Sequence, residues 1–137
     1  MAQIDVKPLV LKDMRFKVAA DNYEKHVSKV QFVPSSSTKT WKGGTPAATF
    51  TDATTPTWVC QVDYVQDWET ADSFSRYLFE HIGETVAAEL TPTTGDDQPS
   101  FTANIVITPG AIGGQIDEFG TTSVTFGSDL PELVEPV

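Results

Sequence analysis

The residues best placed for acid–base or metal chemistry are Glu80, His81 and Glu84, which lie within five positions of one another. An imidazole and carboxylates can bind zinc or move a proton, but zinc motifs hold their ligands in regularly spaced pairs that this cluster lacks. We therefore interpret the cluster as an exposed helix end. The other histidine, His26, has no residue at a spacing that would indicate a catalytic or metal-binding partner, and we expect a structural role for it.

Three further groups of residues fall short of a recognised site. The acidic run of Asp63, Asp67, Glu69 and Asp72 lacks the ligand spacing of a calcium-binding EF-hand, and we expect one or two of these carboxylates to cap a helix. The glycines of residues 110–114 lack the lysine and the following helix of a phosphate-binding loop. The single cysteine, Cys60, lies in an apolar strand pattern, which predicts a buried and unreactive thiol. The sequence therefore predicts no enzyme, no metal site and no cofactor.

Exposed aromatic residues are a better indication of function. Trp41 and Phe50 lie in residues 34–56, a stretch rich in Ser, Thr, Gly and Pro that is too long for an ordinary connection. We expect a long loop here, and a tryptophan on such a segment often anchors a contact with a partner. The alternative is that the loop folds back and buries Trp41 locally.

The elements that position these residues are mostly strands. Alternation of apolar and polar residues predicts six strands, each with one apolar face, at residues 13–18, 25–33, 57–65, 84–91, 100–108 and 121–126. This pattern predicts a mainly β protein, an antiparallel β-sandwich or barrel. No linker divides the chain, so we expect a single domain over residues 1–137.

One segment has a helical period instead. Apolar residues recur at helical spacing within residues 70–82, at Phe74, Tyr77, Leu78 and Ile82. Thr70 is the expected N-cap, and Gly83 is placed to end the helix in a left-handed turn. We therefore expect one amphipathic helix that flanks the β core.

The charges are divided along the chain. Residues 1–42 hold eight of the nine basic residues and four of the nineteen acidic residues. On one folded body this division predicts two surfaces of opposite sign, which favour head-to-tail association of copies. The acidic excess argues against tight binding of nucleic acid. The first residues lack a signal-peptide pattern and no apolar run approaches a membrane span, so we expect folding in a cytoplasm and no membrane partner.

The order of features resembles a known family. The segments that carry the resemblance are residues 29–35, 57–62, 73–78, the Pro-Gly-Ala-Ile-Gly-Gly sequence of residues 109–114, and the ending of residues 122–131. Together they resemble the major tail protein, or tail tube protein, of long-tailed bacteriophages, particularly those that infect actinobacteria. The resemblance covers nearly the whole chain.

This resemblance implies a fold shared with the tube protein of type VI secretion. It also implies hexameric rings that stack into a hollow tube around a tape-measure protein, with tail terminator and distal tail proteins at the tube ends. DNA would pass through the tube without tight binding, past an acidic lumen, and the chain would belong to the virion after assembly in the bacterial host cytoplasm. Residues 34–56 would form an inter-ring loop and residues 127–137 a C-terminal arm. The candidate contacts between subunits are Lys39, Trp41, Lys42, Phe50, Asp129 and Leu130.

A ligand-binding module is the alternative. A monomeric carbohydrate-binding β-sandwich could stack sugars on Trp41 and Trp58. Such a module would have no need of the charge division.

Overall fold

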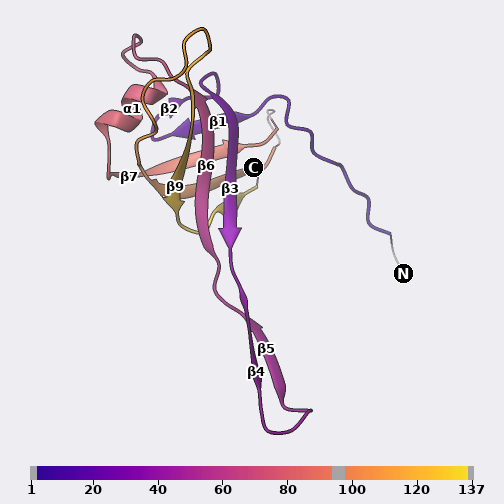
Figure 1. Ribbon diagram of the computed structural model, residues 1–137. Helices are drawn as coiled ribbons and strands as arrows, with labels where there is room; N and C mark the ends of the chain where they lie inside the picture. Colours follow the sequence, from indigo (N-terminus) through magenta and orange to yellow (C-terminus); the bar gives the residue numbers. More distant parts are fainter. Residues whose placement is uncertain (1–2, 94–97, 136–137) are drawn as a thin grey trace.

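The computed structural model describes residues 3–93 and 98–135 and contains the six expected strands (Figure 1). They are β1 (Arg15–Val18), β3 (Val27–Ser35), β6 (Thr57–Val65), β7 (Thr85–Thr91), β8 (Ser100–Val106) and β9 (Thr121–Ser128). Four further strands were not expected: β2 (Asp21–Asn22), β4 (Thr38–Lys42), β5 (Thr49–Ala53) and β10 (Glu132–Val134). The protein is therefore mainly β, as the alternation predicts.

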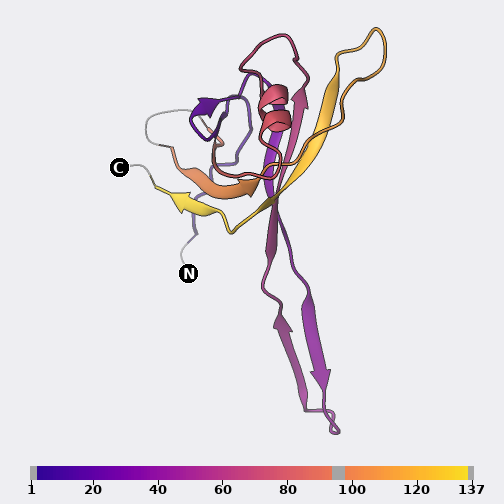
Figure 2. The same cartoon turned by 90° about the vertical axis from the view of Figure 1, so that its left-hand side faces the viewer.

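The strands of the body form one antiparallel sheet in the order β2-β1-β7-β8-β9-β6-β3, and β10 pairs with β8. β8 and β9 share two residue pairs, Ile105 with Ser128 and Val106 with Gly127, so the sheet turns at this junction. The part that contains β1, β7 and β8 then faces the part that contains β9, β6 and β3 (Figure 2). The expected sandwich results from one bent sheet.

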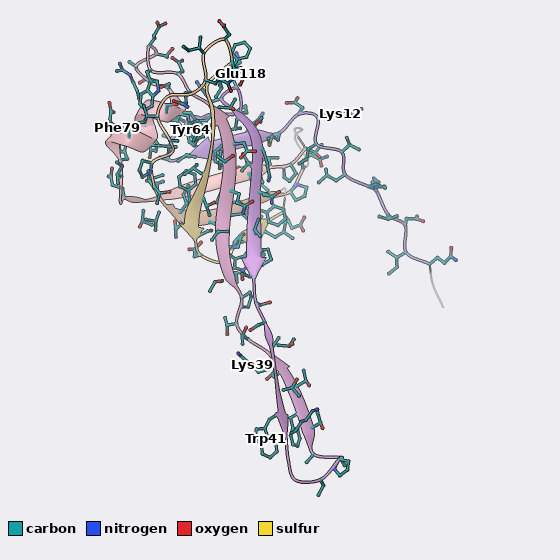
Figure 3. All side chains as sticks on the ribbon, viewed as in Figure 1. Lys12, Lys39, Trp41, Tyr64, Phe79 and Glu118 are labelled. Atoms are coloured by element: carbon teal, nitrogen blue, oxygen red, sulfur yellow. The ribbon has the colours of Figure 1, made fainter. Side chains whose placement is uncertain are left out.

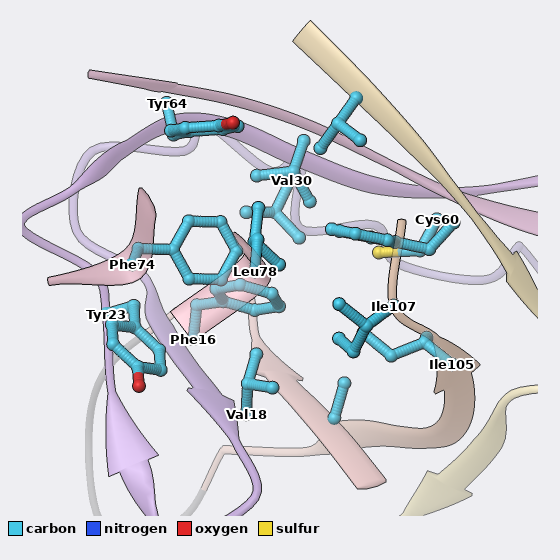
Figure 4. Packing of buried hydrophobic residues seen from close by; sticks show 14 of the residues in the cluster. Phe16, Val18, Tyr23, Val30, Cys60, Tyr64, Phe74, Leu78, Ile105 and Ile107 are labelled. Carbon is cyan, nitrogen blue, oxygen red and sulfur yellow. The ribbon is translucent and has the colours of Figure 1, made fainter. Parts of the chain in front are cut away.

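The core lies between these two parts. It is formed by the apolar residues that alternate with polar ones along each strand. The apolar faces predicted for 57–65 and 121–126 are buried, with Cys60, Val62, Val124 and Phe126 among the core residues. Phe16 and Val18 of β1 and Ile105 of β8 meet them from the other part (Figure 4). Burying one such apolar side chain contributes about 1.5–3 kcal/mol, so the spacing of apolar residues largely determines which face of each strand points inward.

A β-bulge changes the alternation at the start of β3. Its register against β6 shifts between Val27 and Lys29. Because a bulge inserts one residue, Val27 and Val30 both pack against the core although their spacing places them on opposite faces.

The helix α1 (Phe74–Glu80) is shorter than the expected helix of residues 70–82, and its N-cap is Ser73 rather than Thr70. Asp67 Oδ1 accepts hydrogen bonds from the backbone N–H groups of Glu69 and Thr70, which makes a separate turn before the helix. Ser73 Oγ then accepts from the N–H of Arg76 and starts the helix. Helix α1 lies at one end of the sandwich, and its Phe74 and Leu78 enter the core (Figure 1).

Two segments differ from their expected form. Residues 34–56 are not a loop, because β4 and β5 pair into a hairpin that projects away from the body (Figures 1 and 2). The C-terminal segment folds back as well: β9 runs to Ser128, and β10 then pairs with β8. Residues 136 and 137 of the expected arm lie outside the described residues.

The chain has an extended segment at its other end. Residues 3–13 are exposed and form no strand or helix, and they run away from the body (Figure 1). Large apolar side chains are exposed along this N-terminal segment: Ile4, Val6, Leu9, Val10 and Leu11.

Candidate assembly surfaces

The β4–β5 hairpin brings together four of the residues proposed as contacts. Trp41 on β4 lies opposite Phe50 on β5, with ring centroids 6.1 Å apart. Trp41 is 63% exposed and Phe50 is 65% exposed, so the tryptophan does not fold back into a local core. Lys39 and Lys42 lie on the same strand as Trp41, and Lys39 and Trp41 are seen along the hairpin in Figure 3.

The hairpin has two different faces because its side chains alternate. Trp41 and Phe50 share one face with the pair of Lys39 and Asp52. The opposite face carries threonines and Lys42, and Thr40 Oγ1 lies 3.1 Å from Thr51 Oγ1 in a cross-strand hydrogen bond. The hairpin therefore presents an aromatic face with charged residues beside it and a hydroxyl face behind it.

Asp129 and Leu130 lie at a different place and have different surroundings. Asp129 Oδ1 accepts a hydrogen bond of 2.9 Å from the backbone N–H of Asn104, and Oδ2 accepts one of 3.1 Å from Asn104 Nδ2. The carboxylate of Asp129 thus joins the end of β9 to β8 within one copy. Leu130, the next residue, is exposed.

β3 has an open edge. It pairs with β6 on one side, and no strand of residues 3–93 and 98–135 pairs with its other side. A groove of about 520 Å³ lies beside this edge. We call it the lysine groove; its lining includes Leu11, Lys12, Met14, Lys25, Val27 and Lys29, together with the carboxylates of Asp13 and Glu24.

The loop of residues 109–120 forms a second exposed surface that sequence reasoning left unassigned. Gln66 fixes it: Gln66 Nε2 donates to Gly113 O at 2.8 Å, and Gly113 N donates to Gln66 Oε1 at 3.0 Å. Its tip consists of Ile116, Asp117, Glu118 and Phe119, in which Ile116 is 86% exposed and Phe119 is 89% exposed. The sequence feature that could have indicated this exposed surface is the presence of large apolar residues among glycines, outside any periodic pattern.

An apolar groove of about 280 Å³ lies between the N-terminal segment and the sandwich. Trp58 lines it together with Leu9, Phe32, Leu90, Pro92 and Phe101. Binding sites for polar ligands combine apolar walls with several convergent polar groups, whereas the polar groups of this lining are the amide of Gln31 and the indole N–H of Trp58. Trp41 lies on the hairpin rather than in this groove, so the two tryptophans do not form a joint platform for a sugar.

His81 contacts side chains of its own copy, and Cys60 is buried. His81 Nε2 lies 3.9 Å from Glu84 Oε2, and the His81 ring stacks on Tyr77 at 4.2 Å. Burial raises the pKa of the Cys60 thiol to about 12, so the thiol stays protonated at neutral pH. Among the described residues, no three His, Cys, Asp or Glu side chains are grouped as metal ligands. Within the same part of the chain, no helix has the length and apolarity needed to cross a bilayer.

No family model and no curated protein matches this chain. Its structure is similar to a chain in the cryo-EM structure of an extracellular contractile injection system, the PVC sheath–tube complex in its extended state. The TM-score is 0.66 with 12% sequence identity, and the match covers 93% of this chain and 92% of that chain. The two chains therefore share a mainly antiparallel β fold with one helix.

Proposed function

We propose that this protein is a structural subunit whose copies assemble into rings, and that the rings stack into the hollow tube of a phage tail or a related injection particle. The observation that carries the proposal is the open edge of the nine-residue strand β3. Long unpaired edges promote pairing with other chains, and soluble proteins normally shorten or cover them. A ring in which each copy covers the open edge of the next leaves no such edge exposed.

Two further features support assembly. The hairpin projects beyond the body with its aromatic face in solvent, and the N-terminal segment exposes apolar residues over much of its length. Exposed apolar surface of this kind is typical of interfaces between proteins. The fold shared with a chain of a sheath–tube complex agrees with this role.

In this role the subunit would form a hexameric ring, and the stacked rings would enclose a tape-measure protein and later conduct DNA. Tail terminator and distal tail proteins would contact the two ends of the tube. The net charge of −10 disfavours tight binding to the phosphate backbone, which suits a conduit that DNA must leave.

Sedimentation velocity combined with negative-stain microscopy of the concentrated protein tests the proposal. We expect concentration-dependent association and particles in the form of rings or tubes with a central hole. A protein that stays monomeric at every concentration, and binds a polysaccharide instead, would contradict it.

A further inference from the structure

The tip of residues 116–119 and the lysine groove are complementary in chemistry. The tip pairs the carboxylates of Asp117 and Glu118 with the apolar side chains of Ile116 and Phe119. The groove pairs the ammonium groups of three lysines with apolar side chains such as Leu11 and Val27. In residues 3–93 and 98–135, no ion pair within 4 Å engages any of these charged groups of the tip or these lysines.

The two surfaces also lie towards the same end of the sheet. Tyr64 of β6 is opposite Val27 of β3 on one side and opposite Thr122 of β9 on the other. β3 and β9 therefore begin at the same level along the strand direction, and β3 begins beside the groove. The tip ends two residues before the first residue of β9. A neighbour displaced sideways along the sheet, and shifted along the strands by the length over which the tip projects, brings its groove to the tip (Figure 3).

The tip and groove of one copy are held apart by their own sheet. β6 lies between β9 and β3, so the two outer strands are about 10 Å apart at ordinary strand spacing. The loop that carries the tip is fixed above β9 by Gln66, whose Oε1 accepts a hydrogen bond from the N–H of Gly113 and whose Nε2 donates one to the carbonyl oxygen of the same residue. The contact must therefore form between copies.

We propose that the tip of residues 116–119 of one copy docks into the lysine groove of the next copy, beside the open edge of β3. The partner is a second copy of this chain because the two surfaces are complementary in charge: the tip carries two carboxylates, and the groove carries three lysines against two acids. Different patches meet in this contact, so it is head-to-tail, and its repetition closes a ring where the rotation between copies is a whole fraction of a full turn. The inference rests on the proposed function and identifies the surfaces by which neighbours in a ring touch.

Reversal and exchange of the charges test the contact. Variant A carries Asp117→Lys and Glu118→Lys, variant B carries Lys25→Glu and Lys29→Glu, and variant C combines all four substitutions. We expect A and B each to weaken association about tenfold in sedimentation velocity, since each places like charges together. Variant C has the net charge of the natural chain and should restore association to within about threefold, because the charge pairs are re-formed in the opposite sense.

A matched control separates this contact from the effect of total charge. Glu69→Lys with Glu80→Lys changes the net charge as variant A does, at exposed positions outside both surfaces. We expect this control to associate at least as strongly as the natural chain, because it lowers the overall repulsion. Circular dichroism verifies that every variant is folded. Normal association of A and B, or failure of folded variant C to recover, would overturn the proposal.

Crosslinking gives a readout that does not depend on charge reversal. Glu118→Cys and Lys25→Cys are made in separate chains, and a short bismaleimide is added to each alone and to their mixture. The head-to-tail contact predicts crosslinked dimers in the mixture and none in either chain alone, with Cys60 silent because it is buried. Crosslinking of each chain alone, in place of the mixture, would contradict the inference.

The outcomes also separate this inference from the proposed function. Rings that persist in variants A and B leave the function standing and refute the contact. Crosslinking in the mixture without rings supports the contact and refutes the ring. A natural chain that does not sediment as an oligomer, together with cysteine variants whose mixture does not crosslink, refutes both.

Discussion

Among the glycines of the loop of residues 109–120, Gly110 approaches the core most closely. A β-carbon at this position would collide with the Tyr64 hydroxyl and lie 2.7 Å from Thr122 Cγ2. Tyr64 is buried, and its ring packs edge-on against Phe74 at a centroid distance of 5.2 Å. The side chain of residue 110 is therefore excluded by the core itself, and this close approach fixes the base of the loop.

Replacement of Gly110 by alanine should destabilise the protein by roughly 1–3 kcal/mol, the usual cost of forcing an extra carbon into a packed site. Urea unfolding followed by fluorescence measures the change. Gly114→Ala is the matched control in the same loop, because the nearest atom to its added β-carbon lies 3.7 Å away. Equal stability of the two variants would show that the loop adjusts freely at Gly110.

At the scale of single residues, the sequence predicted burial better than capping. Cys60, Val62 and Phe126 are buried as their alternation predicts, because removal of apolar area from water dominates over local preferences. The N-cap was assigned wrongly, since Thr70 and Ser73 are both good capping residues. The choice depends on Asp67, whose carboxylate hydrogen-bonds both the backbone N–H and the side chain of Thr70 in a separate turn, and no local pattern reveals that competition.

At the scale of elements, the β4–β5 hairpin was the main structure that the sequence analysis missed. Hydrophobic alternation reports a strand only where one face is buried, and every residue of β4 and β5 is exposed. The hairpin is instead held by its backbone ladder and by cross-strand pairs such as Thr40 with Thr51 and Trp41 with Phe50. The same reason explains β10, whose three residues are all exposed.

The aromatic face of the hairpin should matter for association and hardly at all for folding. The double change Trp41→Ala with Phe50→Ala is expected to leave the unfolding midpoint nearly unchanged, because both rings are outside the core. It should weaken association by about 2 kcal/mol or more, as the loss of an aromatic anchor does at other interfaces. Sedimentation velocity and thermal unfolding on the same samples measure the two effects.

The opposite face supplies the control for that experiment. Thr40→Ala with Thr51→Ala removes the neighbouring cross-strand pair and leaves both aromatic rings in place. We expect association close to that of the natural chain. If the threonine variant dissociates as strongly as the aromatic variant, integrity of the hairpin rather than its aromatic face governs the contact.

At the scale of the whole molecule, the charge division of the sequence does not form two opposite ends. Lys12, Lys25 and Lys29 lie beside the open edge of β3, whereas Asp117 and Glu118 lie at the tip that precedes β9 (Figure 3). Lys39 and Lys42 are carried away from both surfaces on the hairpin. In the proposed ring, the three lysines beside β3 would therefore face a neighbouring copy in the same ring rather than a ring above or below.

This arrangement also limits wrong pairing at the open edge. The bulge between Val27 and Lys29 and the lysines beside it are devices that discourage indiscriminate strand pairing. In the proposed contact, the acids of the tip would offset the repulsion between the lysines. Two copies that present β3 to each other would instead bring lysines together. The sequence analysis predicted attraction between copies from the charge counts, but its direction depends on strand order, which single-strand patterns do not contain.

A cryo-EM reconstruction of the assembled natural chain tests the central claim most directly, because it places every copy relative to its neighbours. The account predicts a closed ring in which β3 of each copy lies beside residues 109–120 of the next, with the hairpin directed towards an adjacent ring. A two-fold dimer that pairs β3 with β3, or a ring whose neighbours touch through other surfaces, would contradict it.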